Sequence, residues 1–377
     1  MSELYIGLMS GTSLDGIDAG LVEFKENKIQ LIAFDYQPFS DIIKNNIQRL
    51  SQPDQPILLK DYGSLDTQLG LLFAEASNNL LNKANIPNSA VTAIGSHGQT
   101  IYHAPEIDSA FSLQIGDPNI IAEKTGITTV ADFRRRDIAL GGQGAPLVPA
   151  FHQAIFSQIF DLSKKNICVV NIGGIANITY LSANKAIGFD TGPGNTLMDY
   201  WIHKNLNKAY DKNGAWAKSG KVLTDTLTHL KQDPYFQLNP PKSTGKEYFS
   251  PAWLNEKISV TSNCKAEDIQ TTLCQLTAET ITDSIDQHAP LTDHTLICGG
   301  GMHNEYLIDL IQQGLNHPVS STAAFGINPD HVEAMAFAWL AKQTMNNLPG
   351  NLTEVTGAEA PAILGGVYPG KNTLNRK

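Results

Sequence analysis

The chain has 377 residues, of which 42% are hydrophobic and 17% charged, so it is longer than the usual span of one hydrophobic core and we expect two lobes. Its net charge of −10 provides no basic field to neutralise a nucleic acid or an anionic lipid surface. We therefore expect no nucleic acid and no membrane among its partners. An anionic ligand would have to be held locally, by backbone amides, a metal ion and a few cations.

The cysteines lack C-x-x-C spacing, and some lie in apolar runs, so we expect buried free thiols. They are Cys168, Cys264, Cys274 and Cys298. The first residues do not form a basic segment followed by an apolar stretch, and no run of about 18 apolar residues occurs. These features favour a reducing cytoplasm.

Three short apolar runs open the chain, at residues 4–9, 19–24 and 29–34. Glycine or polar residues separate them, which predicts a three-stranded meander. Apolar residues then recur at intervals of three and four across 62–80, so an amphipathic helix should pack on this sheet.

Residues 91–95 are a brief strand candidate. Asp117, Pro118 and Gly126 then suit the N-cap, the first residue and the end of a short helix. A strand at 127–131 would follow that helix.

The second half repeats the order of strand, glycine turn, strand, turn and strand. A helix candidate, a strand ending in three glycines and another helix come next, and the last long helix starts at Asp330. The predicted ranges are 167–171, 178–181, 186–189, 269–285, 295–298 and 304–315. From this duplication we place one lobe at residues 1–131 plus about 330–377 and the other at 132–329.

The loop after the first strand is the first candidate for phosphate binding. It is not a Walker A motif, because Ile17 and Asp18 stand where Lys and Ser or Thr are needed, and no G-x-G-x-x-G follows a strand. Hydroxyls and amides of a tight hairpin could instead surround phosphates, while carboxylates hold Mg²⁺ through water. An ordinary polar β-turn explains these residues equally well. The candidate residues are Gly11, Thr12, Ser13, Leu14, Asp15, Gly16, Ile17 and Asp18 for nucleotide, with Asp15 and Asp18 for metal.

A second pair of glycine loops follows the later strands. An Asp at a strand end with glycines after it is a good position for a general base, which here would be Asp190. The alternative is that Asp190 caps the helix starting near Asn195, although a cap does not account for the glycines. The nucleotide candidates in these loops are Asn171, Gly173, Gly174 and Gly192.

The third glycine turn comprises Gly299, Gly300 and Gly301. Without Cβ atoms, it would let a flat nucleobase or ribose lie against backbone. Any one of the three turns is a weak signal. Together, in the order hairpin, hairpin and helix-opening turn, they are a much more specific sign of a nucleotide site.

Together these segments resemble the sugar kinase, Hsp70 and actin superfamily, and within it the 1,6-anhydro-N-acetylmuramic acid kinase family, nearly end to end. The resemblance implies an α/β fold of two duplicated RNase H-like lobes, of the actin-like ATPase and hexokinase type, with a central cleft between them. Lys246 and Gly194 depart from the family pattern, where Arg is expected and Ala is common. The matching segments are 9–18, 96–100, 132–134, 141–147, 171–174, 190–193, 241–247 and 299–301.

The resemblance also implies the activity. The 1,6-anhydro bridge of the sugar would be hydrolysed while its O6 is phosphorylated from ATP with Mg²⁺, giving N-acetylmuramic acid 6-phosphate and ADP for peptidoglycan recycling. Asp190 would activate the water, and the departing O6 would attack the γ-phosphate. A cytoplasmic homodimer is implied as well.

Residues at the positions that the family uses around its sugar are Ser10, His97, Arg134 and Glu333. The lactyl carboxylate of the sugar would be an anionic partner for the arginine. Structural alternatives remain open for three of them. His97 could be a core histidine, Arg134 could join a solvated ion-pair network, and Glu333 could complete a capping box with Asp330.

Other function classes also remain open. The same superfamily contains other sugar kinases, chaperone-like ATPases in which nucleotide drives a conformational change, and filament-forming proteins. We favour the anhydro-sugar kinase because of the resemblance, and the lack of a separate peptide-binding domain disfavours the chaperone-like class.

Overall fold

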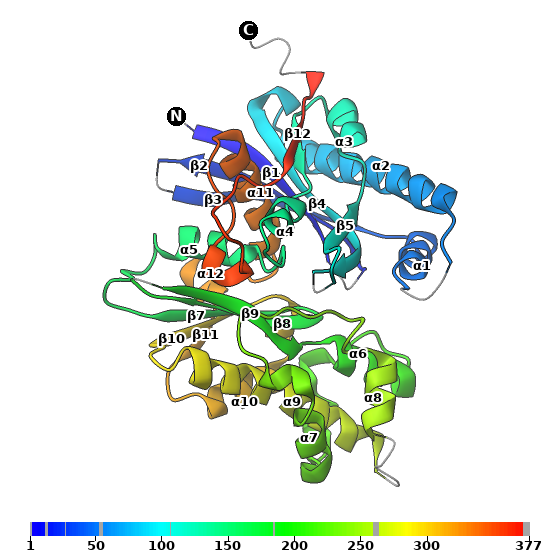
Figure 1. The fold of residues 1–377 in the computed structure, drawn as a ribbon, viewed down its shortest axis with the longest axis vertical. Coiled ribbons are helices and arrows are strands. Elements are labelled where there is room, and N and C mark those ends of the chain that lie inside the picture. Colours follow the sequence, from blue (N-terminus) through cyan, green and yellow to red (C-terminus); the bar gives the residue numbers. More distant parts are fainter. Residues whose placement is uncertain are drawn as a thin grey trace. The chain divides into compact units, whose positions relative to one another are not determined.

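The computed structural model describes residues 2–11, 14–26, 28–52, 56–105, 107–183, 185–258 and 264–371. The chain forms two compact units, one of residues 1–158 with 331–377 and one of residues 159–330 (Figure 1). The division therefore lies after residue 158, and not after residue 131 as expected. The reason is that residues 132–158 pack on the first unit: Phe151 meets Trp339, with 6.3 Å between ring centroids, and Asn351 donates to the Asp137 carboxylate at 2.7 Å.

The first unit is built on a mixed sheet in the order β12-β6-β4-β1-β2-β3, with β5 paired to β4. The predicted meander is confirmed as antiparallel β1 to β3, and β4 and β6 continue the sheet parallel to β1. The strand predicted at 91–95 is much longer, and β5 was not predicted. The bounds are β1 Ser2–Ser10, β2 Gly16–Lys25, β3 Lys28–Pro38, β4 Val91–Ala104, β5 Phe111–Ile115, β6 Thr129–Ala131 and β12 Gly366–Tyr368.

Two helices predicted for the first unit, at 62–80 and after Asp117, are confirmed as α2 and α3. The helix after Asp117 has the expected ends: the Asp117 carboxylate accepts from the Asn119 amide, Pro118 is the first helical residue, and Gly126 has a φ of 72°. The last long helix begins at Val332, two residues later than expected. The bounds are α1 Asp41–Leu50, α2 Leu59–Ala84, α3 Pro118–Thr125, α4 Arg135–Ala139, α5 Val148–Phe156, α11 Val332–Met345 and α12 Thr353–Thr356.

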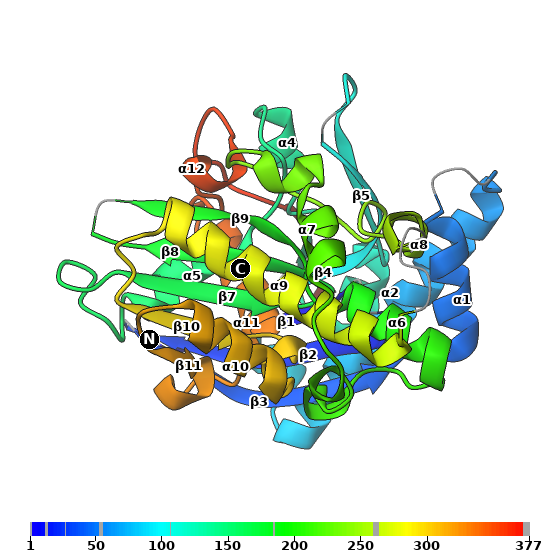
Figure 2. The same cartoon turned by 90° about the horizontal axis from the view of Figure 1, so that it is seen from below.

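The second unit repeats the topology of the first. Its sheet has the order β11-β10-β7-β8-β9, which matches β6-β4-β1-β2-β3 in pairing and direction. This repeat confirms the expected duplicated, RNase H-like α/β fold. Figure 2 shows α9 lying along this sheet. The bounds are β7 Ile167–Ile172, β8 Ile175–Leu181, β9 Ala186–Pro193, β10 His294–Cys298, β11 Val319–Ser321, α6 Thr196–Leu206, α7 Thr224–Lys231, α8 Pro251–Ile258, α9 Ala266–His288 and α10 Glu305–Gly314.

Helix α11 packs unusually close to the first sheet, because glycines face it. A Cβ on Gly7 would lie 1.8 Å from the Ala334 carbonyl oxygen, and one on Gly95 would lie 2.0 Å from the Phe337 carbonyl oxygen. Backbone atoms cannot move aside as a flexible side chain can. The glycines of β1 and β4 therefore set the position of the helix that carries Glu333.

Gly95→Ala is expected to destabilise the protein by about 3 kcal/mol, because the added methyl overpacks a backbone contact. Gly63→Ala is the matched control. Its Cβ on α2 would meet nothing within 4 Å, so we expect it to stabilise the protein by about 0.5–1 kcal/mol. Urea unfolding of both variants measures the difference. Equal effects would contradict the close packing.

Three of the four cysteines are buried, as expected, but Cys264 is exposed. It comes just before α9, where the chain has left the core, so the expectation of a buried thiol was wrong there. Among the described helices, none has the length and apolar composition needed to cross a membrane.

Candidate active site

The β1–β2 turn is tight, as the phosphate-loop hypothesis requires. Leu14 has a φ of 60°, and its amide donates to the Gly11 carbonyl at 3.3 Å. Ser10, at the end of β1, is buried and its hydroxyl donates to Gln99 Oε1 at 2.7 Å. The predicted residues Thr12 and Ser13 lie outside the described part of the chain.

Asp15, in the turn, and Asp18, in β2 opposite Tyr36, act on one phenol. Burial is the main cause of the raised pKa of Tyr36, and the charges of Asp15 and Asp18 raise it further. Asp15 is exposed and Asp18 is half-buried. The negative charges of both carboxylates act on the Tyr36 hydroxyl. By contrast, the Ile17 side chain is fully buried in the core and cannot itself contact a nucleotide.

His97 and Arg134 are joined directly. Nε and Nη2 of Arg134 donate to His97 Nε2 at 3.2 and 2.9 Å, and Nη1 donates to the Gly144 carbonyl at 2.7 Å. Because His97 Nε2 accepts, the ring hydrogen is on Nδ1. Burial holds the pKa of His97 well below its usual range, and the charge of Arg134 lowers it further. A neutral histidine therefore orients the guanidinium.

Arg134 contacts His97 and Gly144, and its neighbour Arg135 forms an ion pair at the surface. Arg135 donates to Asp132 Oδ1 at 2.8 Å and lies 2.7 Å from Oδ2. Asp137 is fully buried and accepts from the Gly144 amide at 2.8 Å. Of the three consecutive arginines, Arg134 is half-buried, whereas Arg135 and Arg136 are exposed.

Glu333 lies in the first turn of α11 and is half-buried. The capping-box alternative is wrong, because the N-cap is His331 and the Asp330 carboxylate accepts from His303 Nε2 at 3.0 Å. Phe337, one turn after Glu333, contacts the His97 ring with 4.7 Å between centroids. Residues four apart share a helix face, so Glu333 lies on the face that meets β4.

The glycine loops of the second unit bind each other through their backbones. Gly194 and Asn195 donate to the Gly174 and Gly173 carbonyls at 2.9 and 2.8 Å. A Cβ on Gly194 would lie 2.4 Å from the Gly173 oxygen. Glycine at position 194 therefore allows the close approach of the two loops.

The third turn joins them at the carboxyl end of β10, beside β7. Gly299 has a φ of 80°, and its Cβ would meet Asn171 Oδ1 at 2.3 Å, while a Cβ on Gly301 would meet the Ile172 side chain at 2.3 Å. A Cβ on Gly300 would meet nothing within 4 Å. The structure thus needs glycine at 299 and 301 for its own packing, whereas residue 300 faces open space.

Asp190 lies in β9 and is 8% exposed. Its Oδ2 accepts from the Thr244 amide at 3.0 Å, its amide donates to the Lys242 carbonyl at 3.2 Å, and its carbonyl accepts from the Tyr235 hydroxyl at 2.7 Å. The helix-cap alternative is wrong, because the N-cap of α6 is Asn195. The carboxylate is held in one orientation beside the glycine loops.

A family profile for anhydro-N-acetylmuramic acid kinase matches residues 3–370. The chain belongs to this family. A relative with that name from Pasteurella multocida is 50% identical over 97% of this chain and 96% of its own, and one from Shewanella denitrificans is 50% identical over 98% and 99%. Among solved structures, a ROK family glucokinase from Streptomyces griseus aligns with 12% identity and a TM-score of 0.41, over 90% of this chain and 99% of that chain.

The residues around Asp190 in this anhydro-N-acetylmuramic acid kinase family member were not predicted individually. Tyr235, Lys242 and Thr244 come from the segment before α8, more than 40 residues further along the chain. The signal present in the sequence was the polar run Pro241-Lys242-Ser243-Thr244-Gly245. It matched the family pattern but carried no indication of which strand it meets.

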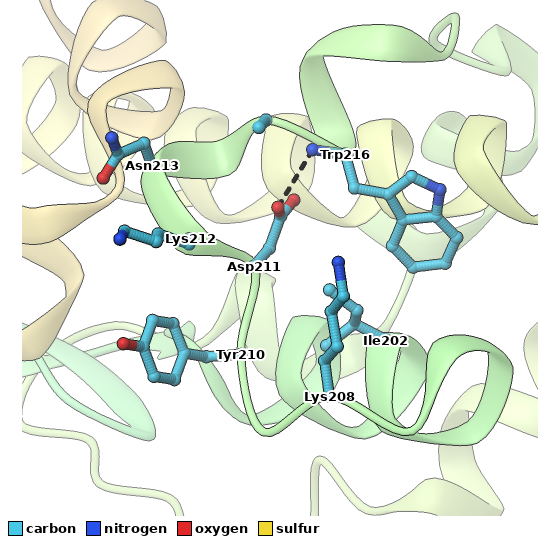
Figure 3. A pocket seen from close by; sticks show the side chains of 8 residues that line it. Ile202, Lys208, Tyr210, Asp211, Lys212, Asn213 and Trp216 are labelled. Atoms are coloured by element: carbon cyan, nitrogen blue, oxygen red, sulfur yellow. Dashed lines mark hydrogen bonds between the residues drawn. The ribbon is translucent and has the colours of Figure 1, made fainter.

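A hollow of about 350 Å³ lies in the second unit of this family member. Figure 3 shows Lys208, Tyr210 and Trp216 around Asp211. The Asp211 carboxylate accepts from the backbone amides of Trp216 and Ala217 at 2.9 and 2.8 Å, so it shapes the loop. No residue of this hollow was a predicted site residue.

Proposed function

We propose that this protein phosphorylates 1,6-anhydro-N-acetylmuramic acid with ATP while hydrolysing its anhydro bridge, giving N-acetylmuramic acid 6-phosphate and ADP in cell-wall recycling. The observation that carries the proposal is the buried Asp190 carboxylate, oriented by the Thr244 amide next to the glycine loops. Family membership supports the identity of the sugar. The buried, oriented carboxylate supports the role of a general base.

In this mechanism, Asp190 accepts a proton from a water molecule as the water oxygen bonds to the anomeric carbon. The bond between that carbon and O6 breaks, and O6 bonds to the γ-phosphorus of ATP as the bond to ADP breaks. The proton later leaves Asp190 for solvent. Coupling is favourable because the phosphoryl group captures the charge that develops on O6.

The first unit supplies groups suited to an anionic sugar. Arg134 is fixed by His97 and Gly144, and its guanidinium suits the lactyl carboxylate. Since the Ser10 hydroxyl donates to Gln99, Ser10 can act toward the sugar as an acceptor. Glu333 would accept from a sugar hydroxyl on the same side of α11.

We assign ATP to the β1–β2 turn and the glycine loops. Mg²⁺ usually takes one or two protein carboxylates together with substrate phosphates and water, and the carboxylates of Asp15, just before β2, and Asp18, in β2, are donors of that kind. These two residues would hold Mg²⁺, directly or through water, and the bound ion would neutralise phosphate charge. Gly299, Gly300 and Gly301 would receive the adenosine.

Product analysis in ¹⁸O-labelled water tests the proposed reaction. Attack of water on the anomeric carbon puts the label in the sugar and leaves the phosphate unlabelled, which tandem mass spectrometry distinguishes. Finished product incubated in labelled water for the same time controls for exchange. Label in the phosphate, ADP release without the sugar, or equal turnover of glucose would each contradict the proposal.

Gly300→Val is expected to raise the KM for ATP by at least about 10-fold with an unchanged melting temperature, because its side chain enters open space that we assign to adenosine. Gly301→Val is the matched comparison, and it should lower the melting temperature because it meets Ile172. Steady-state kinetics and thermal unfolding measure both effects. An unaltered KM in Gly300→Val would rule out this nucleotide position.

A cytoplasmic homodimer completes the proposal, as the family resemblance implies. Light scattering after size-exclusion chromatography would give the mass of the assembly directly. A mass of one chain, about 41 kDa, would contradict the dimer without affecting the proposed reaction.

A further inference from the structure

Lys242 is a buried cation that the proposed mechanism does not yet use. The residue is only 6% exposed. Its ammonium donates to the Tyr235 carbonyl at 3.3 Å and lies over two aromatic rings, 4.8 Å from the centroid of Tyr235 and 5.6 Å from that of Phe189. Phe189 directly precedes Asp190 in β9. The charge is therefore placed beside the strand that carries the candidate base.

Burial of an ammonium is costly unless other groups compensate for the lost water. The ring faces contribute part of this compensation, and the single carbonyl contact is long. Burial lowers the pKa of Lys242, and the negative charge of Asp190 opposes that decrease. The carboxylate is thus one of the groups that keep this buried lysine charged, and the attraction is mutual.

The backbone ties the same two residues together. The Lys242 carbonyl accepts from the Asp190 amide at 3.2 Å, and two residues later the Thr244 amide donates to the carboxylate. One short segment therefore holds both the main chain and the side chain of Asp190. The Lys242 ammonium lies over the rings of Phe189, in β9, and Tyr235.

We propose that Lys242 is a positioning residue for Asp190: its backbone carbonyl holds the Asp190 amide, and its ammonium favours the ionised carboxylate, which can then accept a proton from water. This inference rests on the proposed role of Asp190 as the base. A nearby positive charge favours the ionised form of a carboxyl group. Without it, part of the enzyme would carry a protonated Asp190 that cannot act as a base.

Other titratable groups surround this pair in the described structure. Tyr235 comes from the segment before α8, and His288 comes from α9, where burial lowers its pKa and the charge of Lys242 lowers it further. Next to Tyr235, the buried Asp233 carboxylate accepts from the Tyr235 amide. Its Oδ2 atom lies 3.7 Å from the Lys257 ammonium nitrogen. Lys257 is thus a second cation of the same cluster, and it serves as a control.

Lys242→Met retains the length and the apolar stem of the side chain but removes the charge. We expect the acid limb of the pH profile of kcat/KM to move up by about one pH unit, with much of the lost activity recovered at higher pH. The melting temperature should stay the same or rise, since removing a buried charge relieves its desolvation cost. Lys257→Met should leave the acid limb in place. A folded Lys242→Met enzyme with an unmoved acid limb would overturn the proposal.

A measurement without turnover separates this inference from the proposed function. Labelling lysines with ¹³C allows the Lys242 ammonium to be titrated by NMR, with its signal assigned by its absence in Lys242→Met. We expect a lower pKa in Asp190→Asn than in the wild type, because the attracting charge is gone. Equal pKa values would reject the coupling. Full activity of Asp190→Asn would instead reject the proposed base, whatever the NMR result.

Discussion

Asp190→Asn is expected to lower sugar-dependent ADP release by about 10²–10⁴-fold, the usual contribution of a general base. Asparagine has nearly the same shape, and its side-chain oxygen can still accept from the Thr244 amide. The fold and the binding of both substrates should therefore be retained. The loss should appear in kcat, because the missing step is proton removal from water. A coupled ADP assay with saturating ATP and sugar measures it.

Two control variants test whether the effect is specific to the Asp190 carboxylate. Asp225→Asn changes the same groups at an exposed position on α7, so it should retain full activity. Asp190→Ala removes the carboxyl group and its contact together, and it should be as inactive as Asp190→Asn. Wild-type turnover in the asparagine variant would mean that Asp190 is not the base.

Arg134→Lys is expected to lower kcat/KM for the sugar by about 10- to 100-fold, the value of losing about 1.5–3 kcal/mol of charged hydrogen bonding. Lysine keeps the charge but cannot donate at once to His97 and to the Gly144 carbonyl with the geometry of a guanidinium. The ammonium would no longer be fixed toward a carboxylate. Kinetics at varied sugar and fixed ATP measure this loss.

The adjacent residue is the matched control for this prediction. Arg135→Lys changes an exposed arginine that pairs with Asp132, and exposed pairs contribute little. We expect its kcat/KM to stay within about twofold of the wild type. The Arg134 prediction fails if both variants behave alike, or if the sugar without its lactyl carboxylate is affected to the same degree as the intact sugar.

The local elements of this protein could be predicted from its sequence. The apolar runs of β1 to β3 and β7 to β9 are short and bounded by polar or glycine turns, and the ends of α3 follow from Asp117, Pro118 and Gly126. The repetition of one element order also predicted the duplicated fold. These features depend on residues close together in the chain, so backbone preferences and hydrophobic periodicity decide them.

Family membership and the candidate residues also came from short motifs. Asp190 was selected because an acidic residue at a strand end precedes glycines, and the structure places it buried in β9. The same reasoning left alternatives open for Arg134 and Glu333. Spacing alone cannot show which acidic group an arginine meets or where a helix begins.

Only the tertiary structure decided which distant residues meet. It assigned Arg134 to His97, placed residues 132–158 in the first unit, and brought Tyr235, Lys242 and Thr244 to Asp190. Each of these outcomes depends on burial and on contacts between segments remote in the chain. The periodicity of the sequence does not predict such contacts, because they form only when sheets and helices pack together.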